Sequence, residues 1–509
     1  MLERKLVAAF FAALVLPAAA ANTLVLAAKA TREAAASEKK QGVTAEEQAA
    51  LAQQVRDEFL RSWKAYKKYA WGHDELMPLS KAPRDWYGES LLMTPVDALD
   101  TMLLMGLAEE AEEATDLIVE KLSFDRDIPV KNFEITIRLL GGLLSSYQMT
   151  GDKRLLKLAD DLGTRLLPAF DSPTGMPYMF VNLKSGKTSG AKSNPAEIGT
   201  LVLEFGTLAR LTGKTIYFEK SKNALVQLYS RRSQIGLVGE EIDVETGKWT
   251  SSQSHVGGGI DSYYEYLLKC SILFDDKECG AMWKESLTAL NKYLADKAPP
   301  GLWYGQVDMN SGRRTANEFG ALHAFLPAVL ALGGDLKSAK KLQTSCYRMW
   351  NAHGIEPDLL DYRTMHVLVP AYPLRPEIME SAYYLYSATR GLHPHGDPVY
   401  LEMGKTFFES LMRSCRVDAG TTVLKDVTKG EKGDLMPSYY LAETLKYLYL
   451  LFAPSGTISP IPVVDWNQIV FNTEAHPLRK IPPQPPPPGT KDAGAEDGPA
   501  VAARTPGQR

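Results

Sequence analysis

Three segments of the sequence place acidic residues beside an arginine or a second acid at the start of a predicted helix. In the first segment, residues 132–138 read Asn-Phe-Glu-Ile-Thr-Ile-Arg. Asn132 is a candidate helix N-cap. Arg138 follows Glu134 by one helical turn, so the two side chains share a face. An arginine in that position would hold the Glu134 carboxylate in place.

The second and third segments each bring two acids onto one helix face. A glycine-rich loop leads into a helix whose first turn carries Asp261, and Glu265 lies four residues later. Pro376 suits the first position of another helix, in which Glu377 and Glu380 are three residues apart. Both spacings make the two acids neighbours on the helix surface.

The chemistry open to these acids depends on whether they meet in space. Each acid alone could simply stabilise the positive end of its own helix. Carboxylates that are brought together repel one another unless a substrate or an ion uses them. Acid pairs that face a polyhydroxylated ligand carry out glycoside hydrolysis, in which one protonates the leaving oxygen and another activates water or attacks the sugar. The residues therefore favour a glycosidase.

Other chemistries lack their motifs. The sequence has no Walker loop, no dinucleotide-binding glycine pattern, no GxSxG elbow and no HExxH zinc motif. The formal net charge is −4 over 509 residues. No basic stripe is interleaved with aromatic residues, which argues against a nucleic-acid partner.

The elements that would position the acids are predominantly helical. Amphipathic segments follow one another with short breaks marked by glycine and proline, and strand signals are few and local. Stacked helix hairpins explain this pattern better than a sheet-based fold, and a closed ring of them would form one domain of about 430 residues. The predicted helices span residues 45–69, 95–107, 108–121, 133–149, 153–166, 196–211, 216–230, 260–274, 281–295, 318–332, 336–351, 376–389, 400–415 and 439–452, and residues 463–472 could form a terminal hairpin.

The two ends of the chain are predicted to lie outside this ring. A basic start, an apolar run and an Ala-x-Ala site are typical of a secretory signal peptide over residues 1–21. The apolar run is too short to span a bilayer. Residues 22–43 are predicted to be a flexible segment, and the proline-rich residues 478–509 a disordered tail. No later segment has the length of a membrane helix, so no stable membrane insertion is expected after signal cleavage.

The sequence holds four cysteines, too few in so long a chain to make a disulfide framework. It contains no Asn-x-Ser/Thr sequon, which fits a bacterial exported protein slightly better than a eukaryotic one. The expected compartment is the periplasm or the medium for a bacterial protein and the lumen of the endoplasmic reticulum for a eukaryotic one.

Longer blocks of the sequence resemble the signature segments of glycoside hydrolase family 47, the class I α-1,2-mannosidases. The likeness runs from about residue 55 to residue 477, and the blocks follow the order typical of the family. They are residues 71–76 (WGHDEL), 96–101 (VDALDT), 133–144 (FEITIRLLGGLL), 261–267 (DSYYEYL), 374–377 (LRPE), 441–452 (LAETLKYLYLLF) and 471–477 (FNTEAHP).

The resemblance implies an all-α fold, an (α/α)7 barrel of helix hairpins over residues 44–477 with a C-terminal β-hairpin plug. It implies a calcium-dependent, inverting exo-α-1,2-mannosidase that hydrolyses terminal α-1,2-linked mannose from high-mannose glycans. The partner would be a mannose-containing oligosaccharide or glycoprotein. Ca²⁺ is the implied cofactor, bound by Thr473 at the tip of the hairpin. We expect a monomer.

The resemblance also implies roles for single residues. Glu377 would be the base that activates water, Glu134 and Asp261 are the candidate acids, and Asp358 is a further catalytic carboxylate. The residues implied to line the mannose and ion site are Arg138, Glu265, Arg375, Glu380, Tyr439, Glu443 and Glu474.

Several positions depart from the pattern of the family. Asp358 stands where the family usually has glutamate, and Tyr439 replaces an apolar residue beneath the sugar. Cys346 matches one half of a disulfide found in many members, but Ala324 stands at the position of its partner. Cys346 is therefore expected to be a buried free thiol. Gly259 stands where enzymes of the endoplasmic reticulum that remove a single mannose carry an arginine, which implies cleavage on more than one glycan branch.

A finer likeness leaves a second function open. Residues 233–239 and 242–249 are similar to the branch of mannosidase-like proteins that enhance the degradation of misfolded glycoproteins in the endoplasmic reticulum. The alternative is therefore a lectin-like quality-control factor that binds mannose glycans with little or no catalysis.

Overall fold

The computed structural model describes residues 42–298, 301–390, 392, 396–453 and 468–482. The predicted signal peptide lies outside these residues, as do most of the predicted flexible segment and tail. No helix within the described ranges is long and apolar enough to cross a lipid bilayer.

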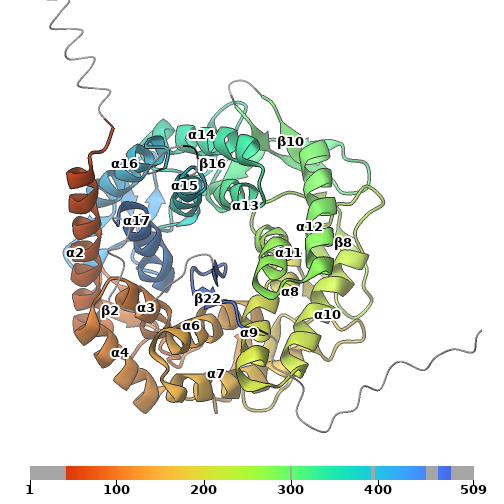
Figure 1. Cartoon of the computed structure of the whole chain (residues 1–509), viewed down its shortest axis with the longest axis horizontal. Coiled ribbons are helices and arrows are strands. Elements are labelled where there is room, and N and C mark those ends of the chain that lie inside the picture. The colour runs from red at the N-terminus through yellow and green to blue at the C-terminus, as the bar shows by residue number, and fades with distance from the viewer. Residues whose placement is uncertain (1–41, 299–300, 391, 393–395, 454–467, 483–509) are drawn as a thin grey trace, which may run out of the picture.

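The described chain forms two concentric rings of helices (Figure 1). Outer and inner helices alternate along the chain, so that helix hairpins close into the predicted all-α barrel. The outer ring consists of α2 (Ala45–Ala70), α4 (Ala108–Lys121), α7 (Lys153–Leu166), α10 (Ile216–Ser230), α12 (Lys277–Ala289), α14 (Leu336–His353) and α16 (Val399–Ser414). The inner ring consists of α3 (Met93–Leu104), α5 (Asn132–Ile135) with α6 (Gly141–Thr150), α8 (Pro195–Gly199) with α9 (Val202–Thr212), α11 (Asp261–Phe274), α13 (Leu326–Leu332), α15 (Glu377–Ala388) and α17 (Leu445–Phe452).

The two rings differ in how much surface they bury. The outer helix α7 is amphipathic, with Leu155, Leu162 and Leu166 buried on one face and charged residues on the other. The inner helix α3 is buried on nearly all sides, because it packs between the outer ring and the centre of the barrel. Strong periodicity made several outer helices easy to predict: α4, α7 and α10 begin and end at the predicted residues. The helix predicted over residues 281–295 is displaced, because Asp276 caps α12 and the helix begins at Lys277.

Short turns of other helix types interrupt or extend several helices. The π-helical turns are η1 (Thr136–Leu140), η3 (Leu290–Leu294) and η5 (Tyr440–Thr444), and the 3₁₀ turns are η2 (Leu167–Phe170) and η4 (Ala321–Phe325). The helix predicted from residue 318 is wrong over its first three residues. Residues Glu318–Gly320 instead form strand β14, because they pair with Leu359–Asp361.

Several helix starts differ from the prediction by one to four residues, and two of them concern acids of the predicted site. Helix α5 begins at Asn132 itself and Lys131 is its cap residue. The buried Asn132 side chain has no hydrogen-bond partner among the described residues, so its predicted N-cap role is wrong. Pro376 is the cap residue of α15 rather than its first residue. Glu377 and Glu380 nevertheless lie in the first turn of that helix.

Short antiparallel strands join the helices in small sheets, and they are more numerous than the sequence indicated. Many of them precede an inner helix, so that the N-terminal ends of the inner helices share one end of the barrel. The strands are β1 (Glu75–Met77), β2 (Ala82–Arg84), β3 (Pro129–Lys131), β4 (Phe180–Asn182), β5 (Thr188–Ser189), β6 (Lys192–Ser193), β7 (Glu241–Asp243), β8 (Trp249–Ser251), β9 (Gln253–Ser254), β10 (Ala295–Asp296), β11 (Trp303–Tyr304), β12 (Gln306–Asp308), β13 (Arg314–Ala316), β14 (Glu318–Gly320), β15 (Leu359–Asp361), β16 (His366–Val369), β17 (Arg416–Val417), β18 (Gly420–Thr421), β19 (Leu424–Asp426), β20 (Glu431–Lys432), β21 (Ile469–Phe471) and β22 (Pro477–Arg479).

A β-hairpin made of β21 and β22 occupies the centre of the ring (Figure 1). Its turn is anchored from inside, because the Asn472 amide donates to Glu204 Oε1 on α9 at 2.8 Å and to the Ile137 carbonyl at 2.9 Å. The predicted terminal hairpin is present, although part of the segment 463–472 lies outside the described residues. Strand β22 continues to Arg479, two residues beyond the expected end of the barrel.

The ring closes where the first helix meets the last. Helix α2 packs against α17, and the Gln48 amide donates to the Leu451 carbonyl at 3.5 Å. Glu47 of α2 also pairs with Lys405 of α16. Side-chain contacts therefore join the first helix of the ring to its last two helices.

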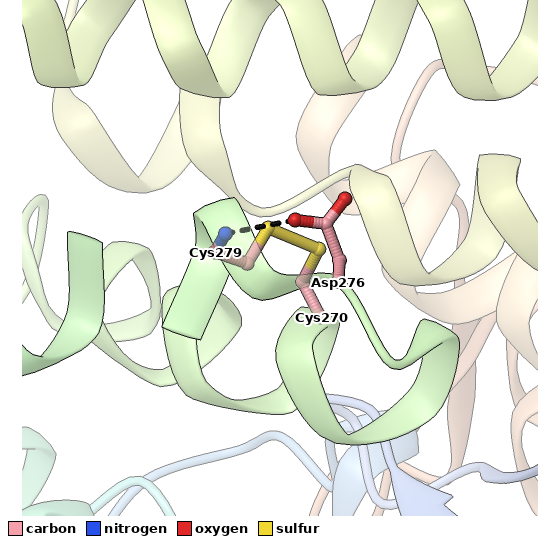
Figure 2. Close-up of side chains that lie close together, drawn as sticks. All are labelled: Cys270, Asp276 and Cys279. Atoms are coloured by element: carbon pink, nitrogen blue, oxygen red, sulfur yellow. Dashed lines mark hydrogen bonds between the residues drawn. A yellow bond between two sulfur atoms is a disulfide. The ribbon is translucent and has the colours of Figure 1, made fainter. Parts of the chain in front are cut away.

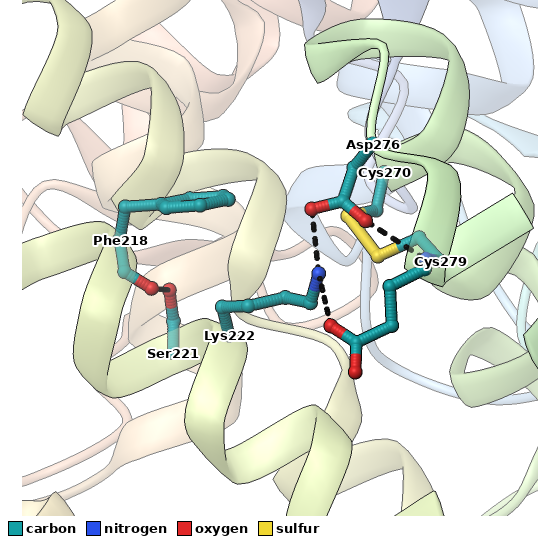
Figure 3. The surroundings of a disulfide bond; sticks show 7 residues. Phe218, Ser221, Lys222, Cys270, Asp276 and Cys279 are labelled. Carbon is teal, nitrogen blue, oxygen red and sulfur yellow. Dashed lines mark hydrogen bonds and ion pairs between the residues drawn. A yellow bond between two sulfur atoms is a disulfide. The ribbon is translucent and has the colours of Figure 1, made fainter. Parts of the chain in front are cut away.

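A disulfide joins Cys270 of α11 to Cys279 of α12, as Figure 2 shows. Asp276 caps α12 by accepting from the Cys279 backbone N–H at 2.8 Å, and it also pairs with the Lys222 ammonium group of α10 (Figure 3). This disulfide was not predicted from the sequence. Asp276 lies close to both sulfur atoms, but sulfurs that are bonded to each other are not thiolate metal ligands. Cys346 is a buried free thiol, as predicted.

Candidate active site

The N-terminal ends of several inner helices surround a cavity of about 300 Å³, and the tip of the central hairpin contributes to its wall. Residues predicted for the site converge here from positions far apart in the sequence. Those that line the cavity are Glu134, Arg138, Asp261, Glu265, Arg375, Glu377, Glu380, Tyr439, Glu443, Thr473 and Glu474.

Asp358 is the predicted catalytic residue that does not line this cavity in the described part of the chain. Its Oδ1 atom lies 3.4 Å from Nε of Arg375, which does line the cavity. Asp358 is therefore placed to orient Arg375 rather than to touch a ligand in the cavity.

Arg138 joins two acids on the cavity wall. Its Nε and Nη2 atoms donate to Glu134 Oε2 at 3.1 and 3.0 Å, as the one-turn spacing predicted. Its Nη1 atom contacts Glu474 of the hairpin and lies 3.6 Å from Asp97 Oδ2. The guanidinium group also lies over the Tyr439 ring, 5.4 Å from its centroid. Arg138 thus ties the hairpin to the inner helices.

Arg138 and Glu443 both lie on π-helical turns. Arg138 lies on the π turn η1, and Glu443 lies on the π turn η5. Such turns often occur at functional sites, because the extra residue redirects side chains relative to an α-helix. Burial raises the pKa of Glu443 well above its ordinary value, and nearby Glu474 adds to the rise.

Asp261 and Glu265 both face the cavity from α11, as their four-residue spacing predicted. Burial raises the pKa of Asp261 to about 7. Glu265 has a cationic partner, because the Lys269 ammonium group binds it and also lies 3.8 Å from Glu380 Oε1. Burial raises the pKa of Glu380 to about 8 despite that lysine.

Glu377 lies in the first turn of α15, directly after Arg375 and Pro376. Its Oε2 atom is buried and has no hydrogen-bond partner among the described residues. Burial raises the pKa of Glu377 to about 7, whereas the neighbouring Arg375 lowers it. A carboxyl group in this state can change its protonation near neutral pH, as a general base or acid must.

The hairpin tip is held so that Thr473 faces the cavity. The Thr473 backbone N–H donates to the Tyr266 hydroxyl at 3.2 Å, and that hydroxyl donates to Glu204 Oε1 at 2.6 Å. Asn472 Oδ1 accepts from the backbone N–H groups of Glu474 and His476, at 2.9 and 2.8 Å. These contacts determine the conformation of the turn.

A fully buried network of charged residues attaches the hairpin to α3 and α17. His476 lies between Asp97 Oδ1, at 3.1 Å, and Asp100 Oδ2, at 2.7 Å. Lys446 of α17 binds Asp100 Oδ1 at 2.7 Å and donates to the Ala475 carbonyl, also at 2.7 Å. These interactions connect the hairpin to α3 and α17, so the wall of the cavity is rigidly attached to the barrel.

The cavity suits a cation as well as a sugar. Carboxylates outnumber the basic groups that line it, and burial, with added repulsion between the acids, raises the pKa of Glu377, Glu380 and Glu474. The unpaired Oε2 atom of Glu377 and the Thr473 side chain add oxygen donors. Ca²⁺ prefers such oxygen ligands. The residues present therefore fit the predicted calcium ion.

Two charged residues of the cavity, Lys131 and Glu197, were not predicted from the sequence. A signal for Glu197 was available, because the run Asn194-Pro195-Ala196-Glu197 has a cap residue, a proline and an acid at the start of a helix. The Asn194 side chain indeed accepts from the Glu197 backbone N–H at 3.0 Å. No comparable pattern marked Lys131.

Comparisons with known proteins agree with this geometry. Residues 58–480 match the model of Glycosyl hydrolase family 47. The chain is 36% identical to "Alpha-mannosidase I MNS5" of Arabidopsis thaliana, with 85% of this chain and 77% of the relative covered. It is 36% identical to the human "ER degradation-enhancing alpha-mannosidase-like protein 2", with 86% of this chain and 78% of the relative covered.

A solved structure supports the same assignment. The structure "alpha-1,2-mannosidase from Trichoderma reesei" matches with a TM-score of 0.77 and 28% identity, and the match covers 85% of this chain and 99% of that one. The family match spans most of the chain, including every residue predicted for the site. The chain therefore belongs to glycosyl hydrolase family 47 and is a glycoside hydrolase of the α-mannosidase group.

Proposed function

We propose that this hydrolase is a calcium-dependent, inverting exo-α-1,2-mannosidase that removes terminal α-1,2-linked mannose from high-mannose glycans. The observation that carries the proposal is the convergence of Glu134, Asp261, Glu377 and Thr473 on one cavity. The linkage is supported by the similarity to the α-1,2-mannosidase from Trichoderma reesei. A cavity of about 300 Å³ lined by several polar side chains suits a terminal sugar.

In this proposal, Glu377 accepts a proton from the attacking water, and a second carboxyl group protonates the leaving oxygen. Asp261 suits the second role, because burial raises its pKa to about 7 and it can hold a proton at neutral pH. Glu134 is bound by Arg138 through two hydrogen bonds and is placed to orient the sugar or to share the donor role. Asp358 would act through Arg375.

The calcium ion would be held by Thr473 with the acids around it, and it would supply a positive charge that binds and orients sugar hydroxyls. Glu265, Glu380, Glu443 and Glu474 are the acids that line this part of the cavity. Lys269 already balances Glu265 and Glu380, and Arg138 balances Glu474. These basic groups keep the acids in place around the ligand.

Export is part of the proposal. The disulfide between Cys270 and Cys279 is typical of proteins that fold in an oxidising compartment. The human relative named as an ER degradation-enhancing protein points to the secretory pathway for that protein. The predicted signal peptide over residues 1–21 would deliver this chain to a compartment of that kind.

A lectin-like quality-control factor is the second candidate. It is favoured by the 36% identity to the human degradation-enhancing relative and by the shortened carboxylate at Asp358. Both candidates need the same cavity, so they differ in turnover and not in binding.

The decisive experiment measures mannose release from mannose-α-1,2-mannose with calcium and with a calcium chelator, and uses Glu377→Gln as a matched control. We expect calcium-dependent release by the natural protein and release slower by roughly 10²- to 10⁴-fold in the variant. Proton NMR during the first minutes should show the inverted anomer of mannose. Tight glycan binding without turnover would favour the lectin-like candidate, and a retained anomer would contradict the inverting mechanism.

A further inference from the structure

Lys131 occupies the cavity wall between two inner helices. It ends β3 and is the cap residue of α5, and its backbone N–H donates to the Tyr87 hydroxyl at 3.2 Å. Its ammonium nitrogen lies 2.6 Å from Glu197 Oε1 and 3.8 Å from Glu134 Oε1. One cation therefore bridges a carboxylate of α8 and a carboxylate of α5.

The Lys131 ammonium group stabilises the ionised form of Glu197, which is buried. The residue is 5% exposed, and its Oε2 atom has no hydrogen-bond partner among the described residues. Burial raises the pKa of Glu197 to about 7, Lys131 opposes that rise, and Glu134 adds to it. With Lys131 present, Glu197 can be an ionised acceptor for a sugar hydroxyl near neutral pH, and its free Oε2 atom is the acceptor available.

Other charged groups around the pair belong to the same cavity. Arg138 of η1 binds Glu134 from its other side, and Asp261 of α11 lines the cavity. Asn194, which caps the helix of Glu197, lines both this cavity and a neighbouring groove, as does Gly259. The pair therefore lies near the junction through which a glycan attached to the bound mannose would leave.

We propose that Lys131 is a positioning residue of this active site, which holds Glu197 and Glu134 as paired carboxylates that bind the sugar hydroxyls next to the scissile bond. The inference rests on the proposed mannosidase function. Lys131 itself takes no part in proton transfer. Its side chain is 32% exposed, so replacing it leaves no large cavity in the core.

Removing Lys131 should raise the pKa of Glu197. Without the ammonium group, Glu197 keeps its burial and its repulsion from Glu134, so its pKa rises further and it is protonated at neutral pH. Loss of a contacting opposite charge typically shifts a carboxyl pKa by one unit or more. A protonated Glu197 accepts sugar hydroxyl bonds poorly, and substrate binding weakens at the pH values where the natural enzyme works.

The kinetic test compares pH profiles of kcat/KM for the natural enzyme, Lys131→Met and Lys131→Arg on the same disaccharide. We expect Lys131→Met to move the acidic limb upward by about one pH unit and to lower kcat/KM about tenfold near pH 6.5, mainly through KM. Lys131→Arg keeps the charge and should restore the profile. The control is Lys214→Met, which removes an ion pair of similar length, 2.7 Å to Asp160 of α7, formed from the connection between α9 and α10.

A stability test separates this inference from the proposed function, because it needs no turnover. Melting temperatures of Lys131→Met, Glu197→Gln and the double variant are measured at pH 5 and pH 8. We expect Lys131→Met to lower the melting temperature more at pH 8 than at pH 5, and Glu197→Gln to remove most of that loss.

The outcomes can be told apart. If the natural protein releases no mannose but the stability cycle shows the coupling, the mannosidase proposal fails and the ion pair stands. Independent effects of the two substitutions at both pH values would overturn the role of Lys131. So would a loss of kcat/KM in Lys131→Met that is the same at every pH, since that result indicates general structural damage.

Discussion

Replacing Glu377 with glutamine should make the protein more stable and nearly inactive at the same time. The reason is the cost of ionising a carboxyl group in the cavity. Burial raises the pKa of Glu377 from its ordinary value of 4.5 to about 7. A shift of that size corresponds to about 3 kcal/mol against the ionised form. Because the side chain is partly open to the cavity, we take this figure as an upper limit.

The sign follows from linkage between protonation and folding. The folded-state pKa lies above the unfolded value, so the proton stabilises the folded protein below about pH 4.5, and this contribution is lost as the pH rises to about 7. Glutamine stays neutral throughout. Glu377→Gln should therefore match the natural protein at pH 4.5 and exceed it at pH 8 by up to about 3 kcal/mol.

The assay is a thermal unfolding series from pH 4.5 to pH 8 in a calcium chelator, so that bound ion does not offset the repulsion. For a barrel of roughly 430 residues, the unfolding entropy converts about 3 kcal/mol into a rise of roughly 3 °C in Tm at pH 8. Activity should fall by roughly 10²- to 10⁴-fold, because the amide cannot accept a proton from water. An equal difference in Tm at both ends of the pH range would refute the electrostatic reasoning, and near-normal turnover would remove Glu377 from the base role.

Three further predictions concern the ion, branch selectivity and the disulfide. Excess chelator should abolish mannose release and Thr473→Ala should weaken it; full activity in chelator would exclude a calcium requirement. On a nine-mannose oligosaccharide, the natural enzyme should trim more than one branch, whereas Gly259→Arg should favour one eight-mannose isomer. The space there is open, since an added Cβ meets Asn194 at 3.7 Å, but φ is +88° and costs about 1–2 kcal/mol. A natural enzyme that stops at one isomer would contradict this selectivity argument. Loss of the Cys270–Cys279 bond, with a sequence separation of 9, should lower the unfolding free energy by about 2.5 kcal/mol, measured for the double serine variant against the oxidised protein.

The sequence predicted the outer helices better than the inner ones. Helix α7 carries its signal locally, in a buried leucine face and an Asp152 cap. The inner segment 133–149 was predicted as one helix, yet it is divided by the π turn η1. That turn depends on packing against the hairpin and α3, which local periodicity does not report. The strand Glu318–Gly320 was likewise hidden, because its pairing partner lies 41 residues later.

Some residues of the site could likewise be predicted from local sequence patterns, and others could not. Acids in the first turns of helices could be recognised from spacing, and Glu134, Asp261 and Glu377 do meet in the cavity. Thr473 was expected there through the family resemblance alone, since one threonine is no metal motif. Lys131 was missed because its importance arises from Glu197, a residue 66 positions away that only the folded chain brings within 2.6 Å.

The central hairpin also determines when, during synthesis, the cavity can be completed. Asn472 binds Glu204, and His476 binds both Asp97 and Asp100. These acids are therefore synthesised long before the hairpin residues that bind them. Until those partners arrive, these carboxylates lie unpaired in the centre of the helical ring, which α2 and α17 have already closed. A nascent chain can therefore form helices step by step, but it cannot complete a sugar-binding cavity before residues 468–482 are available. Truncation before Asn472 should remove Thr473 and Glu474 from the cavity wall, and any cell that makes this protein must keep a nearly full-length barrel without its central hairpin from aggregating.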